Sequence, residues 1–365
     1  MLLSVLREVR DPRDVNARHI LSELLFVALA ATLCGAKSCV EIAEFGKGRK
    51  EDLKEILSLP HGMPSHDTFS RVFRLLDPGE LERAFTAFVA ALRQELGLPP
   101  PRGVVAIDGK ALRRGYEEGQ AHMPPLMVGV WDAETRLAIA GTRAPGGSEV
   151  KGTLEVLKGL SLKGCTVTAD ALHCHPAMAE AVLAAKAQYA LGLKANHGPL
   201  FAAAEAGFAA AGDDLAVFET RDRAHGRSEW RRASILPVAR LPGCPAFPGL
   251  KAIGRIEAER TGTNGKRAAS VRYIVLSRQL SPARLATVIR THWSIENHLH
   301  WTLDVVFHED DARTRKDNAP QNLAVIRRLA QNILRAHPLD KPMASKMRRA
   351  RWSKEFLLEL FTYMR

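Results

Sequence analysis

Two short apolar runs, each followed at once by an aspartate, limit the possible folds of this chain more than any other feature. Val104–Ile107 precedes Asp108, and Cys165–Ala169 precedes Asp170. A short, continuous apolar run bounded by polar residues indicates a strand buried on both faces of a sheet. Further strands are predicted at 126–131, 137–141 and 189–193, with helices at 149–160, 176–186 and 200–211. This alternation predicts an α/β domain with a mixed sheet.

A helix with a carboxylate in line with its apolar face is predicted around Glu296. Ser281-Pro282 has the form of an N-cap followed by proline at the first helical position. Spacings of three and four residues place five side chains on one face of this helix, namely Leu285, Val288, Ile289, Trp293 and Glu296. Burying a charge is costly unless a partner compensates it. Glu296 is therefore expected to face a partner inside the protein.

The rest of the chain divides by pattern. Residues 1–98 are predicted to be entirely helical, with a helix break at Pro78-Gly79. This pattern suits DNA binding and a plain helical bundle equally well. The run Leu98-Pro99-Pro100-Pro101 predicts a stiff linker and a domain boundary. Residues 215–278 are mostly β in pattern, and a basic tail from 339 precedes a last amphipathic helix at 356–363.

The charge of the chain favours a polyanionic partner. Lys and Arg number 52 against 40 Asp and Glu, which gives a formal net charge of +12. Nucleic acid is the simplest such partner, although a basic protein without one explains the charge alone equally well. Five cysteines without CxxC spacing indicate reduced thiols in a cytosolic protein. The apolar run Leu24–Ala36 is too short to span a bilayer and predicts a buried helix.

Three carboxylates are candidates for one site. Asp108 and Asp170 end strands of the same predicted sheet, and Glu296 lies on a helix that can pack on that sheet. Carboxylates at close range repel one another unless a cation neutralises them, and hard oxygen ligands suit Mg²⁺ or Mn²⁺. Two such ions activate a nucleophile and stabilise the leaving oxygen in attack on a phosphodiester. Each acid also has a structural interpretation, as a turn residue, a helix cap or an arginine partner.

At these residues the chain resembles bacterial insertion-sequence transposases of the DDE type, in the branch that includes the H-repeat-associated proteins. The resemblance extends over nearly the whole length, as an ordered set of short motifs. They are Asp11-Pro12-Arg13, Ser65-His66-Asp67-Thr68-Phe69, Ile107-Asp108-Gly109-Lys110, Thr168-Ala169-Asp170-Ala171, His292-Trp293-Ser294-Ile295-Glu296-Asn297, Leu303-Asp304-Val305-Val306-Phe307 and Asn318-Ala319-Pro320 with Asn322.

The resemblance implies an RNase H-like catalytic core with Asp108, Asp170 and Glu296 as its metal-binding triad. It also implies a helical N-terminal domain that binds DNA ends, and a homodimer that holds two ends together on double-stranded DNA. Two Mg²⁺ ions are expected, with Mn²⁺ as a substitute, in a cytoplasmic protein that acts at the bacterial nucleoid. The domains expected are residues 1–98, a core formed by 103–214 and 279–338, a β-rich insertion at 215–278, and a tail at 339–365.

Residues near the three acids are candidates for DNA contacts. They are Lys110, Arg113, Arg114, Lys194, His292, Trp293 and Asn297. Trp293 can stack on a displaced base, although its place in the apolar stripe favours the core. Related transposases outside the branch carry Tyr, Arg and Lys around the glutamate; here those places hold Ile289, His292 and Leu303. Their phosphate contacts are therefore not assigned to this chain.

The sequence thus predicts a metal-dependent transposase that binds the ends of its element, cuts them and joins the freed 3′-hydroxyls to target DNA. Two alternatives remain open. One is a catalytically idle or repurposed DNA-binding protein, and the other is an RNase H-like nuclease that cuts without strand transfer.

Overall fold

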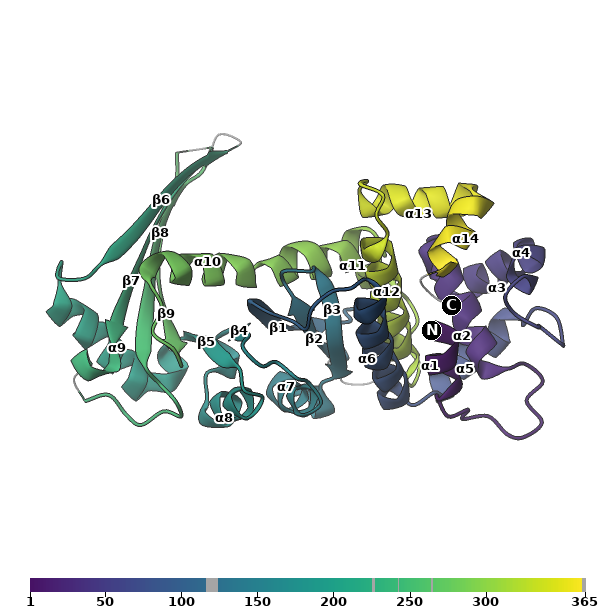
Figure 1. The fold of residues 1–365 in the computed structure, drawn as a ribbon, viewed down its shortest axis with the longest axis horizontal. Coiled ribbons are helices and arrows are strands. Elements are labelled where there is room, and N and C mark those ends of the chain that lie inside the picture. The colour runs from purple at the N-terminus through teal and green to yellow at the C-terminus, as the bar shows by residue number, and fades with distance from the viewer. Residues whose placement is uncertain (116–123, 225–226, 242, 264, 363–365) are drawn as a thin grey trace.

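The computed structural model describes the whole chain except residues 116–123, 225–226, 242, 264 and 363–365. The molecule is elongated, with one sheet along most of its length and a helical domain at one end (Figure 1). The order of the strands is β3-β2-β1-β4-β5-β9-β8-β7-β6. Within the described residues, no helix is both long and apolar enough to cross a bilayer.

Five strands form the half of the sheet that carries Asp108 and Asp170. They are β1 (Val104–Ala111), β2 (Leu126–Asp132), β3 (Leu137–Arg143), β4 (Thr166–Ala169) and β5 (Gln188–Leu193). β1, β4 and β5 run parallel, whereas β2 is antiparallel to both β1 and β3. The predicted mixed sheet and the RNase H-like core are therefore confirmed.

The β-rich segment extends this same sheet. Its strands are β6 (Val217–Ala224), β7 (Arg227–Pro237), β8 (Ala252–Thr261) and β9 (Arg267–Leu276). β9 pairs with β5 in antiparallel register, from Ala190 opposite Leu276 to Leu193 opposite Tyr273. Backbone hydrogen bonds therefore continue from the core strands into the β-rich segment. The four strands rise well beyond the core as a wing (Figure 1).

Helices cover both faces of the sheet. On one side lie α7 (Glu149–Lys158) and α8 (Pro176–Ala184), and on the other lies a long helical segment (Figure 1). That segment consists of α10 (Pro282–His292), the π-helical turn η5 (Ile295–His300) and α11 (Trp301–Val305). α9 (Gly198–Ala211) packs on the wing. Gly254 of β8 lets α10 approach, because a Cβ there would lie 2.5 Å from Leu285 Cδ2.

The helical domain contains the N-terminal helices and the last two helices. The bounds are α1 Leu2–Arg7, α2 Leu21–Leu33, α3 Cys39–Gly48, α4 Lys50–Lys54, α5 His66–Leu75, α6 Pro78–Glu95, α13 Met343–Trp352 and α14 Lys354–Thr362. α2 is buried along almost its whole length, as its apolar sequence predicts. Short 3-10 turns occupy Pro145–Gly147, Ala171–His173, Ala195–His197, Val238–Arg240 and Glu309–Asp311.

The helix α12 (Ala319–Ala336) joins the helical domain to the sheet, and every residue from Ala319 to Leu334 is buried. On the sheet side, Asn332 Nδ2 donates to Ala138 O at 2.7 Å, and Asn332 Oδ1 accepts from Ala138 N at 3.0 Å. On the other side, Asn322 Nδ2 donates to Phe73 O and Leu76 O at the end of α5. Both asparagines therefore satisfy backbone groups that no strand or helix partner takes up.

Three details differ from the expectations. β1 continues to Ala111, so Asp108 lies inside the strand rather than at its end. α6 begins at Pro78, where a helix break was expected, because Asp77 caps it through a hydrogen bond from Gly79 N. The basic tail forms α13, which was not foreseen. The predicted end of the last helix at Tyr363 lies outside the described residues.

Candidate metal centre and basic groove

The register of β1 and β4 brings the two aspartates to the same level of the sheet. Ala106 is paired with Thr168, and Asp108 and Asp170 each follow two residues later. Side chains two residues apart on a strand point to the same face. Asp108 points toward η5, where it contacts His300, whereas the next residue, Gly109, faces α7, where a Cβ would lie 2.4 Å from Glu149 Cδ.

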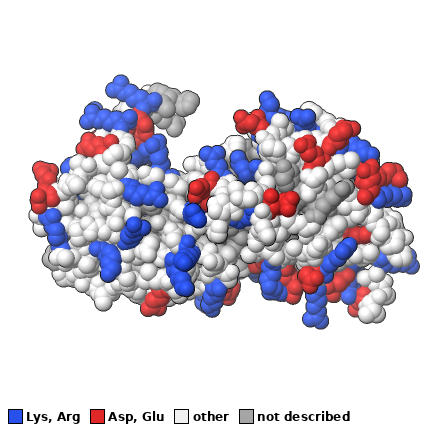
Figure 2. Space-filling model, in the orientation of Figure 1, with Lys and Arg blue, Asp and Glu red and all other residues white. Residues whose placement is uncertain are grey.

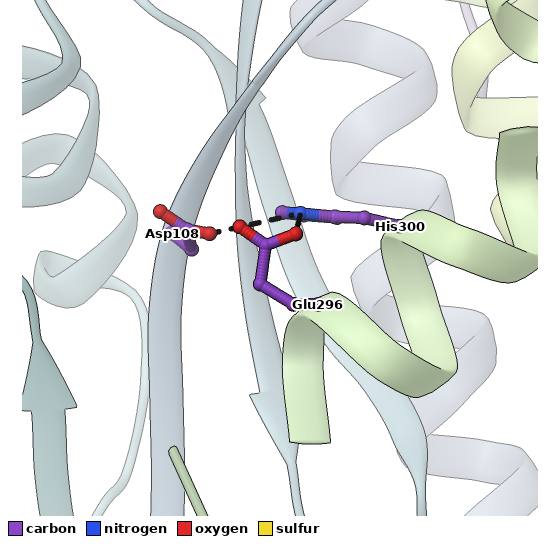
Figure 3. A group of neighbouring side chains, drawn as sticks. All are labelled: Asp108, Glu296 and His300. Carbon is purple, nitrogen blue, oxygen red and sulfur yellow. Dashed lines mark hydrogen bonds and ion pairs between the residues drawn. The ribbon is translucent and has the colours of Figure 1, made fainter. Parts of the chain in front are cut away.

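Asp108, Glu296 and His300 form one group of possible metal ligands. One ligand atom from each lies within 4.8 Å of the others. His300 Nδ1 is 3.6 Å from Asp108 Oδ2 and 3.4 Å from Glu296 Oε2. Figure 3 shows the imidazole and the two carboxylates meeting between the strand and the helix. Two carboxylates and one imidazole are a suitable donor set for a divalent cation.

Glu296 lies in the π-helical turn η5, at the border of its buried face. Leu285 and Val288 of α10 are buried, and Ile295 and Leu299 continue this buried line in η5. The Glu296 side chain keeps 49% of its exposure. The expectation that Glu296 lies within the apolar stripe is therefore wrong. Trp293 is likewise 45% exposed, which contradicts its expected place in the core.

The pKa values of the two neighbouring carboxylates are shifted in opposite directions. Burial, together with the closeness of Glu296, raises the pKa of Asp108 to about 8. The contact with His300 holds the pKa of Glu296 below its usual range. A divalent cation at this place would remove the repulsion and favour both carboxylates in their ionised form.

Glu149, Asp170 and His173 form a second group within the same 4.8 Å limit. His173 is fully buried; its Nδ1 lies 3.1 Å from Asp170 Oδ1, and its Nε2 lies 2.9 Å from Thr153 Oγ1. Glu149 Oε1 is 3.6 Å from the same Nε2. The hydrogen bond from His173 lowers the pKa of Asp170, whereas burial raises the pKa of Glu149.

The two groups are neighbours rather than one cluster. Asp170 does not join Asp108 and Glu296 within the 4.8 Å limit applied to the described residues. Glu149 raises the pKa of Asp108 and is itself affected by Asp170 and His300, so it lies between the groups. The structure thus brings Asp108 and Glu296 together and places Asp170 beside them.

Three residues of these groups were not among the predicted site residues: Glu149, His173 and His300. His300 is four residues after Glu296 and His173 is three after Asp170, so each shares a helical face with its acid. This spacing is the sequence signal from which the two histidines could have been predicted as neighbours of the acids. The role of Glu149, at the start of α7, is indicated only by its contacts in the folded protein, with Gly109 and His173.

Of the basic residues expected to contact DNA, Lys110 is buried and forms ion pairs within the protein. It is 7% exposed, and its Nζ lies 2.6 Å from Asp304 Oδ1 and 3.0 Å from Asp310 Oδ1. A phosphate contact from Lys110 would require these ion pairs to break. Arg113 pairs with Asp310 at 3.2 Å but remains 74% exposed.

The other expected contacts are accessible or lie close to the acids. Arg114 and Lys194 are exposed. His292 is partly buried, and its Nδ1 lies 2.9 Å from Thr168 Oγ1, next to Asp170 and Glu296. Burial lowers the pKa of His292, which favours a neutral imidazole that hydrogen bonds to the threonine.

A groove of about 840 Å³ lies between the wing and α10 and reaches η5. Trp293 and Asn297 line its end nearest Glu296, and Arg231, Arg272 and Arg290 line its length. The Arg272 guanidinium lies over the Trp293 ring at 5.2 Å from the ring centre. In Figure 2 the molecule is hollowed between the wing and the helical domain, with Lys and Arg side chains around the hollow. An exposed indole among arginines suits a nucleic-acid strand.

The stability of the metal-free protein is expected to depend on pH through Asp108. Its raised pKa means that the native state binds a proton more tightly than the unfolded state does. The free energy of unfolding should therefore fall as the pH rises from about 4, the usual pKa of an aspartate, to about 8, the raised pKa of Asp108. Asp170 acts in the opposite sense, but below this window. Denaturant unfolding with EDTA should show wild type losing stability relative to Asp108→Asn across the window, and parallel curves would contradict this account.

Two family models match the chain. The model described as Transposase DDE domain matches residues 99–333, and the one described as DDE_Tnp_1-associated matches residues 3–89. "Putative transposase YncI" of Escherichia coli O157:H7 is 32% identical over 349 residues, covering 91% of this chain and 86% of that protein. "H repeat-associated putative transposase YhhI" of Escherichia coli K12 is 29% identical and covers 97% of this chain and 95% of that protein.

Among solved structures, the chain is similar to a piggyBac transposase in a synaptic complex with hairpin DNA. The TM-score is 0.46 at 14% sequence identity, with 98% of this chain and 78% of that chain covered.

Proposed function

The chain belongs to the family of transposases with a DDE domain, and on that premise we propose that it cuts and joins DNA at the ends of its own insertion sequence. The observation that carries the proposal is the meeting of Asp108 and Glu296 with His300, next to the group that contains Asp170. These acids come from two neighbouring interior strands of the sheet and a helix packed on them, where the groove ends.

The proposed metal ligands are Asp108, Asp170 and Glu296. We assign them two Mg²⁺ ions, for which Mn²⁺ can substitute, because carboxylate-rich sites favour these ions. When bound, the ions would activate the attacking hydroxyl and stabilise the leaving oxygen of the phosphodiester. The protein contributes the alignment. β1 and β4 fix the aspartates, and the Trp131 indole, which donates to Ser294 Oγ at 3.0 Å, holds the start of η5.

The groove is the proposed path of the DNA toward these acids. Arg231, Arg272 and Arg290 would contact phosphates, and Trp293 would stack on a base near the cut. Asn297, His292 and Lys194 lie nearer the acids, while Arg113 and Arg114 lie beyond β1. The N-terminal helical domain would bind the specific end sequence. Joining two ends requires that both be held together, and we therefore propose a homodimer on double-stranded DNA, acting at the nucleoid in the bacterial cytoplasm.

The direct test supplies purified protein with a DNA fragment that carries one end of the element, with Mg²⁺ or with EDTA. We expect Mg²⁺-dependent nicking at the end and then joined products with a target plasmid. Nicking without joined products would favour an RNase H-like nuclease. Binding without nicking would favour an idle or repurposed DNA-binding protein.

The role of the groove can be tested with Arg272→Gln. Loss of one phosphate contact should weaken DNA binding about equally on every sequence and reduce the slope of log K against log salt by about 1. The matched control is Lys158→Gln, an exposed cation at the end of α7 on the opposite side of the sheet (Figure 1). Fluorescence anisotropy at several salt concentrations measures both slopes. Equal slopes for the two variants would exclude Arg272 from the DNA surface.

A further inference from the structure

We propose that His300 Nδ1 is a direct ligand of the divalent ion held by Asp108 and Glu296, so that this half of the centre is a mixed nitrogen and oxygen site. The inference rests on the proposed function, since it concerns the same centre. It adds a residue that lies outside the carboxylate triad and gives that residue a defined chemistry.

The placement of the imidazole supports the assignment. His300 is 6% exposed, and the two polar contacts of its Nδ1 are with Asp108 Oδ2 at 3.6 Å and Glu296 Oε2 at 3.4 Å. These separations are long for charge-assisted hydrogen bonds, which are about 2.7–2.9 Å. They are closer to the spacing of atoms around an ion, since neighbouring ligands of an octahedral ion at about 2.1 Å lie about 3 Å apart.

The other ring nitrogen does not compete for this role. His300 Nε2 is buried and has no hydrogen-bond partner among the described residues, so Nδ1 makes the polar contacts of the ring. The helix also fixes the ring: His300 follows Glu296 by one turn of η5, and the neighbouring Leu299 is fully buried. In Figure 3 the ring points from the helix toward the space between the two carboxylates.

The second buried histidine serves as an internal comparison. His173 uses both ring nitrogens, Nδ1 with Asp170 at 3.1 Å and Nε2 with Thr153 at 2.9 Å. A ring hydrogen bonded at both ends has no lone pair left for an ion, because a neutral imidazole has one donor and one acceptor. His173 is therefore a positioning residue for Asp170, whereas His300 remains able to coordinate.

A nitrogen ligand changes the choice of ion. Imidazole favours later divalent transition metals, whereas oxygen-only sites favour Mg²⁺ and Ca²⁺. The His300 half-site should therefore bind Mn²⁺ more tightly than Mg²⁺. Replacing the imidazole by a carboxylate in His300→Asp should shift this preference toward Mg²⁺, by about tenfold in the ratio of the two dissociation constants, the order expected when a group of a metal site is altered.

The experiment uses Mn²⁺ with the full-length protein and needs no DNA. Electron paramagnetic resonance gives the dissociation constant, and electron spin-echo modulation detects nitrogen bound to Mn²⁺. In wild type we expect nitrogen modulation that changes when histidine is labelled with ¹⁵N, a result that requires no substitution. His300→Ala should lose that modulation and bind Mn²⁺ at least about tenfold more weakly. His298→Ala, in the same helical turn, and His173→Gln should keep it.

Two results would overturn the inference: Mn²⁺ bound to wild type without nitrogen modulation, or nitrogen modulation that persists in His300→Ala. The labelled wild type keeps the test valid even if His300→Ala fails to fold. The proposed function is judged separately. If wild type cuts and joins DNA but shows no nitrogen modulation, only the role of His300 is contradicted. If nitrogen is bound to Mn²⁺ but the protein never cuts DNA, only the transposase activity is contradicted.

Discussion

Asp170→Ala is expected to lower the rate of DNA cleavage by about 1,000-fold or more while leaving DNA affinity unchanged or slightly higher. Stabilisation of the transition state by a metal ion is worth several kcal/mol, and each factor of ten in rate corresponds to about 1.4 kcal/mol. Affinity depends mainly on phosphate contacts from Lys and Arg, and removing an anion beside DNA does not weaken these. Cleavage of an end fragment in Mg²⁺ and anisotropy in Ca²⁺ measure the two quantities.

Asp170 is the most informative of the three acids because it lies in the neighbouring group with Glu149 and His173 rather than with Asp108 and Glu296. The matched control is Glu180→Ala, which removes an exposed carboxylate from α8 nearby and should leave cleavage intact. Cleavage by Asp170→Ala at the wild-type rate would remove Asp170 from the mechanism and leave the Asp108–Glu296–His300 group as the whole centre.

Asn332→Leu is expected to lower the free energy of unfolding by about 2–6 kcal/mol, the largest effect on stability that we predict for one side chain. The asparagine amide donates to Ala138 O and accepts from Ala138 N, on the outer edge of β3. Leucine has a similar volume but leaves both backbone groups buried without a partner, each at a cost of about 1–3 kcal/mol. Urea unfolding followed by circular dichroism gives the change.

The control for Asn332→Leu is Gln94→Leu, which replaces an exposed amide near the end of α6 and should change stability by less than about 0.5 kcal/mol. If the two variants unfold at the same urea concentration with the same slope, the amide of Asn332 does not hold the edge of the sheet. A changed slope for Asn332→Leu alone would instead indicate that β3 detaches before the rest of the protein unfolds.

Local patterns allowed most of the secondary structure to be predicted. The apolar runs before Asp108 and Asp170 identified β1 and β4, and the Ser281-Pro282 pair located the start of α10. The continuation of β1 past Asp108 was missed because Asp-Gly usually marks a turn, whereas pairing with β2 extends the strand to Ala111. Pairing of this kind depends on a partner strand that no short window contains.

The candidate site was only partly predictable for a related reason. Glu296 was assigned to the apolar stripe from spacings of three and four residues, whereas the buried line runs through Ile295 and Leu299 and leaves Glu296 at its border. The residues around the acids come from other elements. Glu149 belongs to α7 and lies against Gly109, and Asp304 and Asp310 form ion pairs with Lys110. Their roles follow from packing distances, which the order of residues along the chain does not give.

The burial of α12 has a consequence for how such a protein can change over evolution. Because α12 is enclosed by the sheet on one side and the N-terminal helices on the other, either half expressed alone would expose a long apolar stripe to water. If the N-terminal helices bind the ends of the element as proposed, a lineage could not acquire a new DNA specificity by exchanging the first hundred residues as an independent module. New specificity would have to arise through surface substitutions on helices whose inner faces stay fixed.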